Sequence, residues 1–122
     1  MSVQEDLLER LFAGIAGGDV DAVAELYADD VEVWNTASRH PMQREESLAV
    51  LRSFLRRADA VRYEVLERRQ WQGGAMQRHV LHVRVGDRDH RIDVCVTFAF
   101  ADGRIRRIYE YVDSRALAPL GW

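Results

Sequence analysis

The second half of the chain constrains the fold most, because it consists of four consecutive strand-like segments. These segments are rich in β-branched and aromatic residues and cover residues 61–70, 75–85, 88–100 and 104–112. They are separated by short glycine-containing turns at Gly73-Gly74, Gly86-Asp87 and Asp102-Gly103. Turns of this length and composition join antiparallel neighbours. The second half is therefore predicted to form an antiparallel meander.

The first half has helical periodicity instead. Ser2 and Glu5 have the spacing of a capping box, and leucines at helical spacing follow until Gly17-Gly18. Asp19 is predicted to cap a second helix that ends near Asp29-Asp30. A short strand is expected over 31–34, and a third helix over 44–58. The order α-α-β-α-β-β-β-β predicts a single α+β domain over 1–122, with the helices on one face of a curved sheet.

Charge and cysteine content exclude several classes of protein. The arginines alternate with acidic residues and form no long basic block, so a nucleic-acid surface is not expected. Cys95 is the only cysteine, which excludes an internal disulfide and a multi-cysteine zinc site. The chain has no apolar run long enough to span a membrane, and its first residues are acidic, so a cytoplasmic protein is expected.

Alternation along the strands predicts which side chains share a face. In the segment 75–85, His79 falls on the same side as Leu81 and Val83, which is the side expected to face the helices. In the segment 88–100, Val94 belongs to the apolar inner set and Cys95 to the outer set. For 104–112 both sets contain large side chains, so the face of Glu110 remains open at this point.

Several short motifs resemble those of a known family. They are the helix-to-strand junction Leu26-Tyr27-Ala28-Asp29-Asp30-Val31, the hairpin Asp102-Gly103-Arg104-Ile105 and the ending Ile108-Tyr109-Glu110-Tyr111-Val112-Asp113. Together they resemble the SnoaL-like branch of the NTF2-like superfamily over nearly the whole chain. The resemblance implies a cystatin-like cone, in which a bent antiparallel sheet wraps around a long N-terminal helix. It also implies a pocket inside the cone and a homodimer formed through the outer face of the sheet.

The family includes polyketide cyclases, ketosteroid isomerase, dehydratases and limonene epoxide hydrolase, so the fold does not define the reaction. Compared with the epoxide hydrolase pattern, Asn35 and Glu110 stand at matching positions. His79, Leu81 and Val33 replace the other residues of that pattern, including the carboxylate that protonates the epoxide. Epoxide hydrolysis is therefore the less favoured reaction.

The best candidate site combines Glu110, His79 and Asn35. A glutamate in an apolar pocket has a raised pKa, which suits proton transfer, and histidine titrates near neutrality. An asparagine amide can hold water or a carbonyl group. Each residue also has a structural interpretation: an ion pair between Glu110 and an arginine, a buried hydrogen-bonded His79, and a loop start at Asn35.

We therefore expect a protein that binds a small hydrophobic organic molecule, with Glu110 and His79 as catalytic residues and no cofactor or metal. The reaction expected is of isomerase, cyclase or dehydratase type. The alternative is a non-catalytic ligand-binding or dimerisation domain. The residues expected to contact the ligand are Asn35, Trp34, Tyr27, Val94, Val112 and Leu117.

Overall fold

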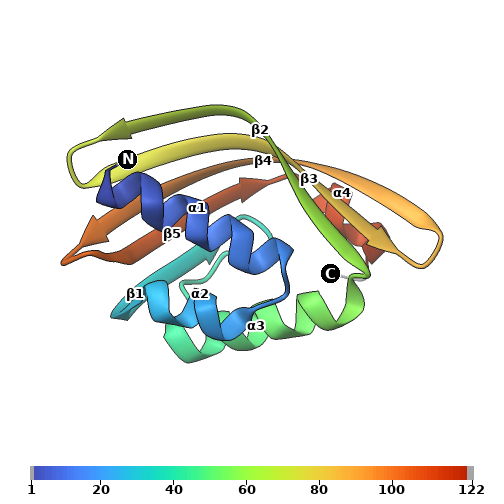
Figure 1. The fold of residues 1–122 in the computed structure, drawn as a ribbon. Coiled ribbons are helices and arrows are strands. Elements are labelled where there is room, and N and C mark those ends of the chain that lie inside the picture. The colour runs from blue at the N-terminus through green and yellow to red at the C-terminus, as the bar shows by residue number, and fades with distance from the viewer. Residues whose placement is uncertain (1, 121–122) are drawn as a thin grey trace.

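The structure is a computed structural model that describes residues 2–120. Its elements follow the predicted order, and two short helical turns follow the last strand (Figure 1). They are α1 (Val3–Ala16), α2 (Val20–Leu26), β1 (Tyr27–Asn35), α3 (Arg44–Arg57), β2 (Ala60–Trp71), β3 (Gly74–Val85), β4 (Arg88–Ala101), β5 (Arg104–Val112), α4 (Ser114–Leu117) and the 3-10 turn η1 (Ala118–Leu120). The α+β fold class is confirmed.

The ends of α1 follow from its sequence. The hydroxyl of Ser2 accepts a hydrogen bond from the backbone N–H of Glu5 at 3.1 Å, which is the serine half of the capping box. The apolar face of α1 is buried against the sheet, and the helix ends at Gly17. As a result α1 presents a continuous apolar stripe to the concave side of the sheet.

The second helix is shorter than expected. It ends at Leu26 rather than near Asp29-Asp30, because Tyr27 already has extended backbone angles (φ −83°, ψ 135°). β1 therefore begins at Tyr27, where it pairs with Ile105 of β5. This early start places the Tyr27 side chain in the core, with 6% of its surface exposed.

The sheet contains the predicted meander, since β2, β3, β4 and β5 pair with their neighbours in antiparallel fashion. The first strand differs from the expectation of an all-antiparallel sheet. β1 lies at the edge and pairs with β5 in parallel, which gives the order β1-β5-β4-β3-β2. No tight turn joins β1 to β5, so local sequence does not dictate their relative direction.

The inner and outer faces of the sheet follow the predicted alternation. His79 is buried on the inner face of β3, with 2% exposed surface, and Val94 is buried on the inner face of β4. Cys95 is half-buried on the outer face. A bulge at Ala99/Phe100 shifts the β4–β5 register. Beyond this bulge, β5 turns Glu110 inward with its apolar neighbours.

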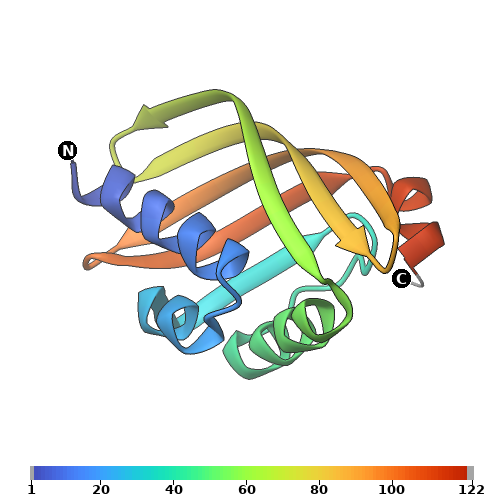
Figure 2. The same cartoon turned by 45° about the vertical axis from the view of Figure 1, so that its right-hand side comes forward.

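The helices gather on one side of the sheet. Figures 1 and 2 show the bent strands arching over α1, α2 and α3, while α4 lies near the far end of the strands. The buried residues of α1, α2, α3 and the inner strand faces form one apolar core. Among residues 2–120, no helix is both long and apolar enough to cross a membrane.

Candidate functional site

Glu110 lies in the middle of β5 on the inner face of the sheet. Its backbone pairs with Asn35 of β1 on one side and Val96 of β4 on the other. The side chain is half-buried, and no hydrogen bond or ion pair joins its carboxylate to another described residue. Burial raises the pKa of the Glu110 carboxyl above its ordinary value. Among residues 2–120, no arginine forms the ion pair with Glu110 that was the structural alternative to a catalytic role.

Two tyrosines lie close enough to Glu110 to respond to its charge. Burial, and secondarily the negative charge of Glu110, raise the pKa of the hydroxyl groups of both Tyr27 and Tyr63. Both phenols therefore stay protonated at neutral pH and remain hydrogen-bond donors. Tyr27 comes from β1 and Tyr63 from β2, so the two rings approach from opposite edges of the sheet. We call Tyr27, Tyr63, His79 and Glu110 the inner polar cluster.

The inner polar cluster is not sealed off from water-sized molecules. Neither tyrosine hydroxyl makes a hydrogen bond to a described residue. Within residues 2–120, the only fully buried side-chain polar atom that lacks a partner is Nε of Arg44. The unpartnered oxygens of Glu110, Tyr27 and Tyr63 are therefore not fully buried, and each can be reached by a water molecule.

His79 also lies on the inner face, but no hydrogen bond or ion pair joins it to Glu110. Its ring makes edge contacts with Phe12 at 5.5 Å and with Tyr63 at 5.0 Å between ring centroids. β4 lies between the strands that carry His79 and Glu110. Burial, and secondarily the positive charge of Arg68, lower the pKa of His79 to about 4. The imidazole is consequently neutral at pH 7.

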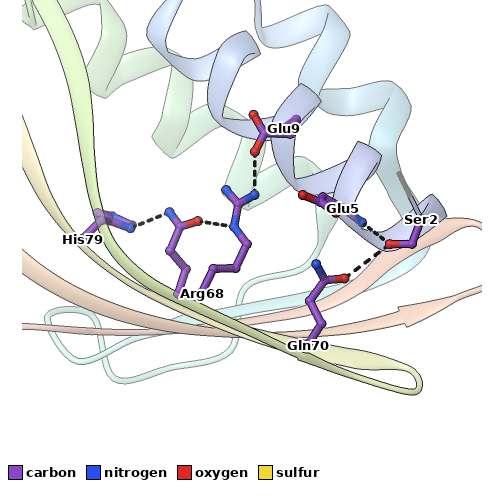
Figure 3. Close-up of polar contacts among 7 residues, drawn as sticks. Ser2, Glu5, Glu9, Arg68, Gln70 and His79 are labelled. Atoms are coloured by element: carbon purple, nitrogen blue, oxygen red, sulfur yellow. Dashed lines mark hydrogen bonds and ion pairs between the residues drawn. The ribbon is translucent and has the colours of Figure 1, made fainter.

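A chain of hydrogen bonds connects His79 to the surface of α1. Glu9 accepts from Nη1 of Arg68 at 2.5 Å, Nε of Arg68 donates to Oε1 of Gln77 at 2.8 Å, and Nε2 of Gln77 lies 2.9 Å from Nδ1 of His79. Figure 3 shows Arg68 reaching from β2 toward Glu9 on the helix. Gln77 is completely buried.

The side-chain oxygen of Asn35 has the loop-start role. Its side-chain oxygen accepts from the backbone N–H of Ser38 at 2.8 Å, and its backbone oxygen accepts from Arg39. This turn begins directly after β1, as expected for asparagine at a strand end. Asn35 is the cross-strand neighbour of Glu110 through the backbone, but its Oδ1 is already occupied by the turn.

Trp34 lies on the opposite face of the sheet from Glu110, which corrects its expected place at the pocket. It pairs with Tyr109 in the β1–β5 register, and its ring contacts those of Tyr109 at 6.0 Å and Tyr111 at 5.5 Å. Alternation makes this unavoidable, because Asn35 faces inward and its neighbour must face outward. These three aromatic residues, with Glu32 and Pro41, line a shallow hollow of about 350 Å³ on the outer face.

The apolar residues that were predicted to contact a ligand lie in the interior. Val94 is part of the buried core, and Val112 and Leu117 are half-buried against it. Leu117 ends α4, and Leu120 of η1 also packs against the core. The sequence analysis missed Tyr63, Gln77 and Arg68. A glutamine two positions before His79 shares its face, so alternation offered a signal for Gln77.

The arrangement combines one proton acceptor with several neutral donors. An unpaired carboxylate with a raised pKa can take a proton from carbon and return it. Neutral phenol and imidazole groups can donate hydrogen bonds to an oxygen that gains negative charge. Among the described residues, no three His, Cys, Asp or Glu side chains are grouped so that they could hold a metal ion.

Comparison with known proteins places this geometry in context. A family profile described as the SnoaL-like domain matches residues 8–108. A comparison with curated protein sequences gives no match.

Solved structures of similar fold span almost the whole chain. The wild-type form of IdmH from Streptomyces antibioticus, a proposed polyketide cyclase, is 20% identical with a TM-score of 0.82, and the match covers 97% of this chain and 98% of that one. An LEH-like epoxide hydrolase from M. tuberculosis is 17% identical with a TM-score of 0.79, covering 93% and 85%. A proposed SnoaL-like polyketide cyclase from Shewanella denitrificans OS-217 is 11% identical with a TM-score of 0.85, covering 98% and 96%. At these identities the similarity shows the NTF2-like fold.

Proposed function

The chain belongs to the SnoaL-like domain family. We propose that the protein binds a small apolar organic molecule beneath the concave face of its sheet. We propose further that it catalyses cofactor-free proton transfer on the bound molecule. Glu110 is the group that moves the proton. The observation that carries the proposal is the Glu110 carboxylate, which is buried enough to have a raised pKa and has no partner among the described residues.

The substrate class follows from the surroundings of Glu110. The core residues around the inner polar cluster are apolar, so they favour a hydrophobic carbon skeleton over a sugar or a phosphate. The donors nearest to Glu110 are neutral, and they suit an uncharged carbonyl oxygen that becomes negative during the reaction. A ketone with acidic α-hydrogens meets both requirements.

The proposed reaction begins with transfer of an α-proton from the ketone to the Glu110 carboxylate. The electron pair of the C–H bond moves to the carbonyl oxygen and forms an enolate, which receives a hydrogen bond from a neutral donor. The protonated Glu110 then returns the proton to carbon, either at the original position or at a conjugated one. An isomerase or an aldol-type cyclase begins with the same step, so the two differ in what the enolate does next.

Exchange of α-hydrogens in heavy water tests this step without a known substrate. A panel of apolar ketones is incubated with the protein, and loss of the α-proton signal is followed by NMR. Wild type should accelerate the exchange of at least one ketone over buffer, and Glu110→Gln should reduce the acceleration by roughly 100-fold or more. Glu32→Gln is the matched control, because Glu32 lies on the outer face beside Tyr109, and it should exchange at the wild-type rate.

Two outcomes of this experiment oppose the proposal in different ways. Equal acceleration by wild type and Glu110→Gln would remove Glu110 from the chemistry. Binding of ketones without accelerated exchange would favour the alternative, a non-catalytic ligand-binding domain.

We also propose that the protein forms a homodimer through the outer face of its sheet. Tyr111 is 49% exposed there beside Trp34, and exposed aromatic residues are enriched in protein interfaces. Tyr111→Glu should shift sedimentation from dimer to monomer. A wild-type protein that sediments as a monomer at every concentration would contradict this part of the proposal.

A further inference from the structure

The hydrogen-bond chain that ends at His79 has a fixed direction, and this direction follows from the chemistry of its members. The guanidinium of Arg68 can only donate, so the Gln77 atom that faces Nε of Arg68 must be the oxygen. The other end of the Gln77 amide is then its NH₂ group, which can only donate. It lies 2.9 Å from Nδ1 of His79.

This direction determines which nitrogen of His79 carries the proton. Nδ1 must accept the hydrogen bond from Gln77, so it has no proton. A neutral imidazole with a bare Nδ1 carries its single proton on Nε2. Protonation of the ring would place an N–H of His79 directly opposite an N–H of Gln77, which adds to the burial and the Arg68 charge that already oppose a positive imidazole.

The Nε2–H group is the only polar end of His79 that is left for a ligand. It makes no hydrogen bond to a described residue, and it is not among the fully buried unpartnered atoms of residues 2–120. Nε2 is therefore not fully buried, and a small polar group can reach it. The ring cannot turn over to present Nδ1 there without breaking its bond to Gln77.

We propose that His79 is a fixed hydrogen-bond donor to a ligand oxygen, and that Gln77 and Arg68 are positioning residues that hold the ring in this tautomer. The inference rests on the proposed function and deepens it, since it assigns to His79 the recognition of a carbonyl or enolate oxygen rather than proton abstraction. Glu9 completes the chain by anchoring Arg68 from α1.

The tautomer can be measured directly in the ligand-free protein. Nitrogen-15 NMR of the imidazole distinguishes the Nε2–H form, the Nδ1–H form and the imidazolium. At pH 7 we expect the Nε2–H form in at least about tenfold excess, the ratio that one net hydrogen bond provides. A predominant Nδ1–H form or imidazolium would overturn the proposal, and this result needs no variant.

A single isosteric substitution should reverse the tautomer. In Gln77→Glu the new carboxylate accepts from both Arg68 and His79, so the ring should carry its proton on Nδ1 and leave Nε2 bare. The matched control is Gln70→Glu on the same hairpin. Gln70 is exposed and bonds to Ser2 rather than to any member of the hydrogen-bond chain that ends at His79 (Figure 3). The control variant therefore adds the same charge but should leave the Nε2–H form of His79 unchanged. An unchanged tautomer in folded Gln77→Glu would contradict the role of Gln77.

Cyclohexanone labelled with carbon-13 at the carbonyl tests the recognition step. A hydrogen bond to the carbonyl oxygen moves the carbon resonance downfield. We expect a downfield shift at saturating ketone with wild type and Gln70→Glu, and its loss with Gln77→Glu. No shift with wild type, or an equal shift with Gln77→Glu, would overturn the assignment of His79 as the donor.

Both measurements are repeated in the Glu110→Gln protein, which separates this inference from the proposed function. The Nε2–H tautomer and the carbonyl shift should persist there, because neither depends on proton abstraction. If no ketone exchange is found in wild type but both signals are present, the catalytic proposal fails while the role of His79 stands. Loss of both signals in Glu110→Gln would contradict a donor that is set by Gln77 and Arg68.

Discussion

The ring of Tyr63 lies edge-on to the ring of His79, with centroids 5.0 Å apart and planes at 88°. The charge of Glu110 also raises the pKa of Tyr63, although no hydrogen bond or ion pair joins Glu110 to His79. Tyr63 therefore lies between the Glu110 carboxylate and the hydrogen-bonded imidazole of His79. The two residues that the sequence identified as a catalytic pair are connected through a third that it did not identify.

Removing only the hydroxyl of Tyr63 should reduce catalysis while preserving the fold. In Tyr63→Phe the ring keeps its contacts with Phe12 and His79, but the site loses a neutral donor near Glu110. We expect ketone exchange to fall by about tenfold or more. The free energy of unfolding should change by less than ~1 kcal/mol, because the hydroxyl bonds to no described residue. Tyr111→Phe on the outer face is the control, and equal exchange rates for the two variants would contradict the role of Tyr63.

The pH dependence of stability should report the buried Glu110. Its native pKa is raised above the ordinary 4.5, so the native state holds the proton more tightly than the unfolded state. The contribution of Glu110 to stability is therefore unaffected below pH 4.5 and falls as the pH rises from 4.5 through the native pKa. Chemical denaturation of both proteins should show that the stability of wild type relative to Glu110→Gln falls across this window. Parallel curves would mean that Glu110 has no raised pKa.

His79 should have the opposite effect on stability. Its pKa is lowered from 6.5 to about 4 in the native state, so the unfolded state binds the proton more tightly. The contribution of neutral His79 to the free energy of unfolding is fully present above pH 6.5. It should fall by about 3 kcal/mol as the pH drops to 4. The two titrations overlap, so the measurement compares Glu110→Gln with the double variant that also carries His79→Gln. A loss of equal size in both proteins would show that another group is responsible.

Thr36 should stabilise the end of the β1–β5 pair beside Glu110. Its hydroxyl donates to the backbone oxygen of Val112 at 2.6 Å and accepts from the backbone N–H of Val112 at 2.9 Å. Its own N–H donates to the backbone oxygen of Glu110 at 3.1 Å. Thr36→Val removes both hydroxyl bonds and should lower the free energy of unfolding by ~1–3 kcal/mol.

Thr36→Ser serves as the control for this substitution, because it keeps the hydroxyl and loses only a methyl group. Thermal denaturation should place Thr36→Ser near wild type and Thr36→Val well below it. A serine variant as unstable as the valine variant would show that packing of the methyl group, rather than the hydrogen bonds, accounts for the effect.

Much of the fold was predictable because its signals are local. The glycine turns and the alternation of apolar residues define the meander, and they place His79 and Val94 on the inner face. The parallel pairing of β1 with β5 was not predictable from these signals, because no short turn joins the two strands. The end of α2 at Leu26 depends on that same pairing, which begins at Tyr27.

The site was predictable only in part, because its polar contacts join residues far apart in the chain. The sequence identified Glu110 and His79 as inward candidates, and both face inward. The lowered pKa of His79 depends on burial against Phe12 and, secondarily, on the charge of Arg68, which the pattern of β3 alone does not reveal. Trp34 was misplaced because it is the neighbour of Asn35 in β1, and alternation allows only one of the two to face inward.

Titration of the Glu110 carboxyl in the wild-type protein tests the central claim most directly. Carbon-13 NMR of the glutamate side chains, with the Glu110 signal assigned by its loss in Glu110→Gln, gives the pKa of this group without any substrate. We predict a midpoint above 4.5, because burial without a partner disfavours the charged form. A midpoint at or below 4.5 would mean that the carboxylate is solvated or paired, and it would contradict Glu110 as a group poised for proton transfer.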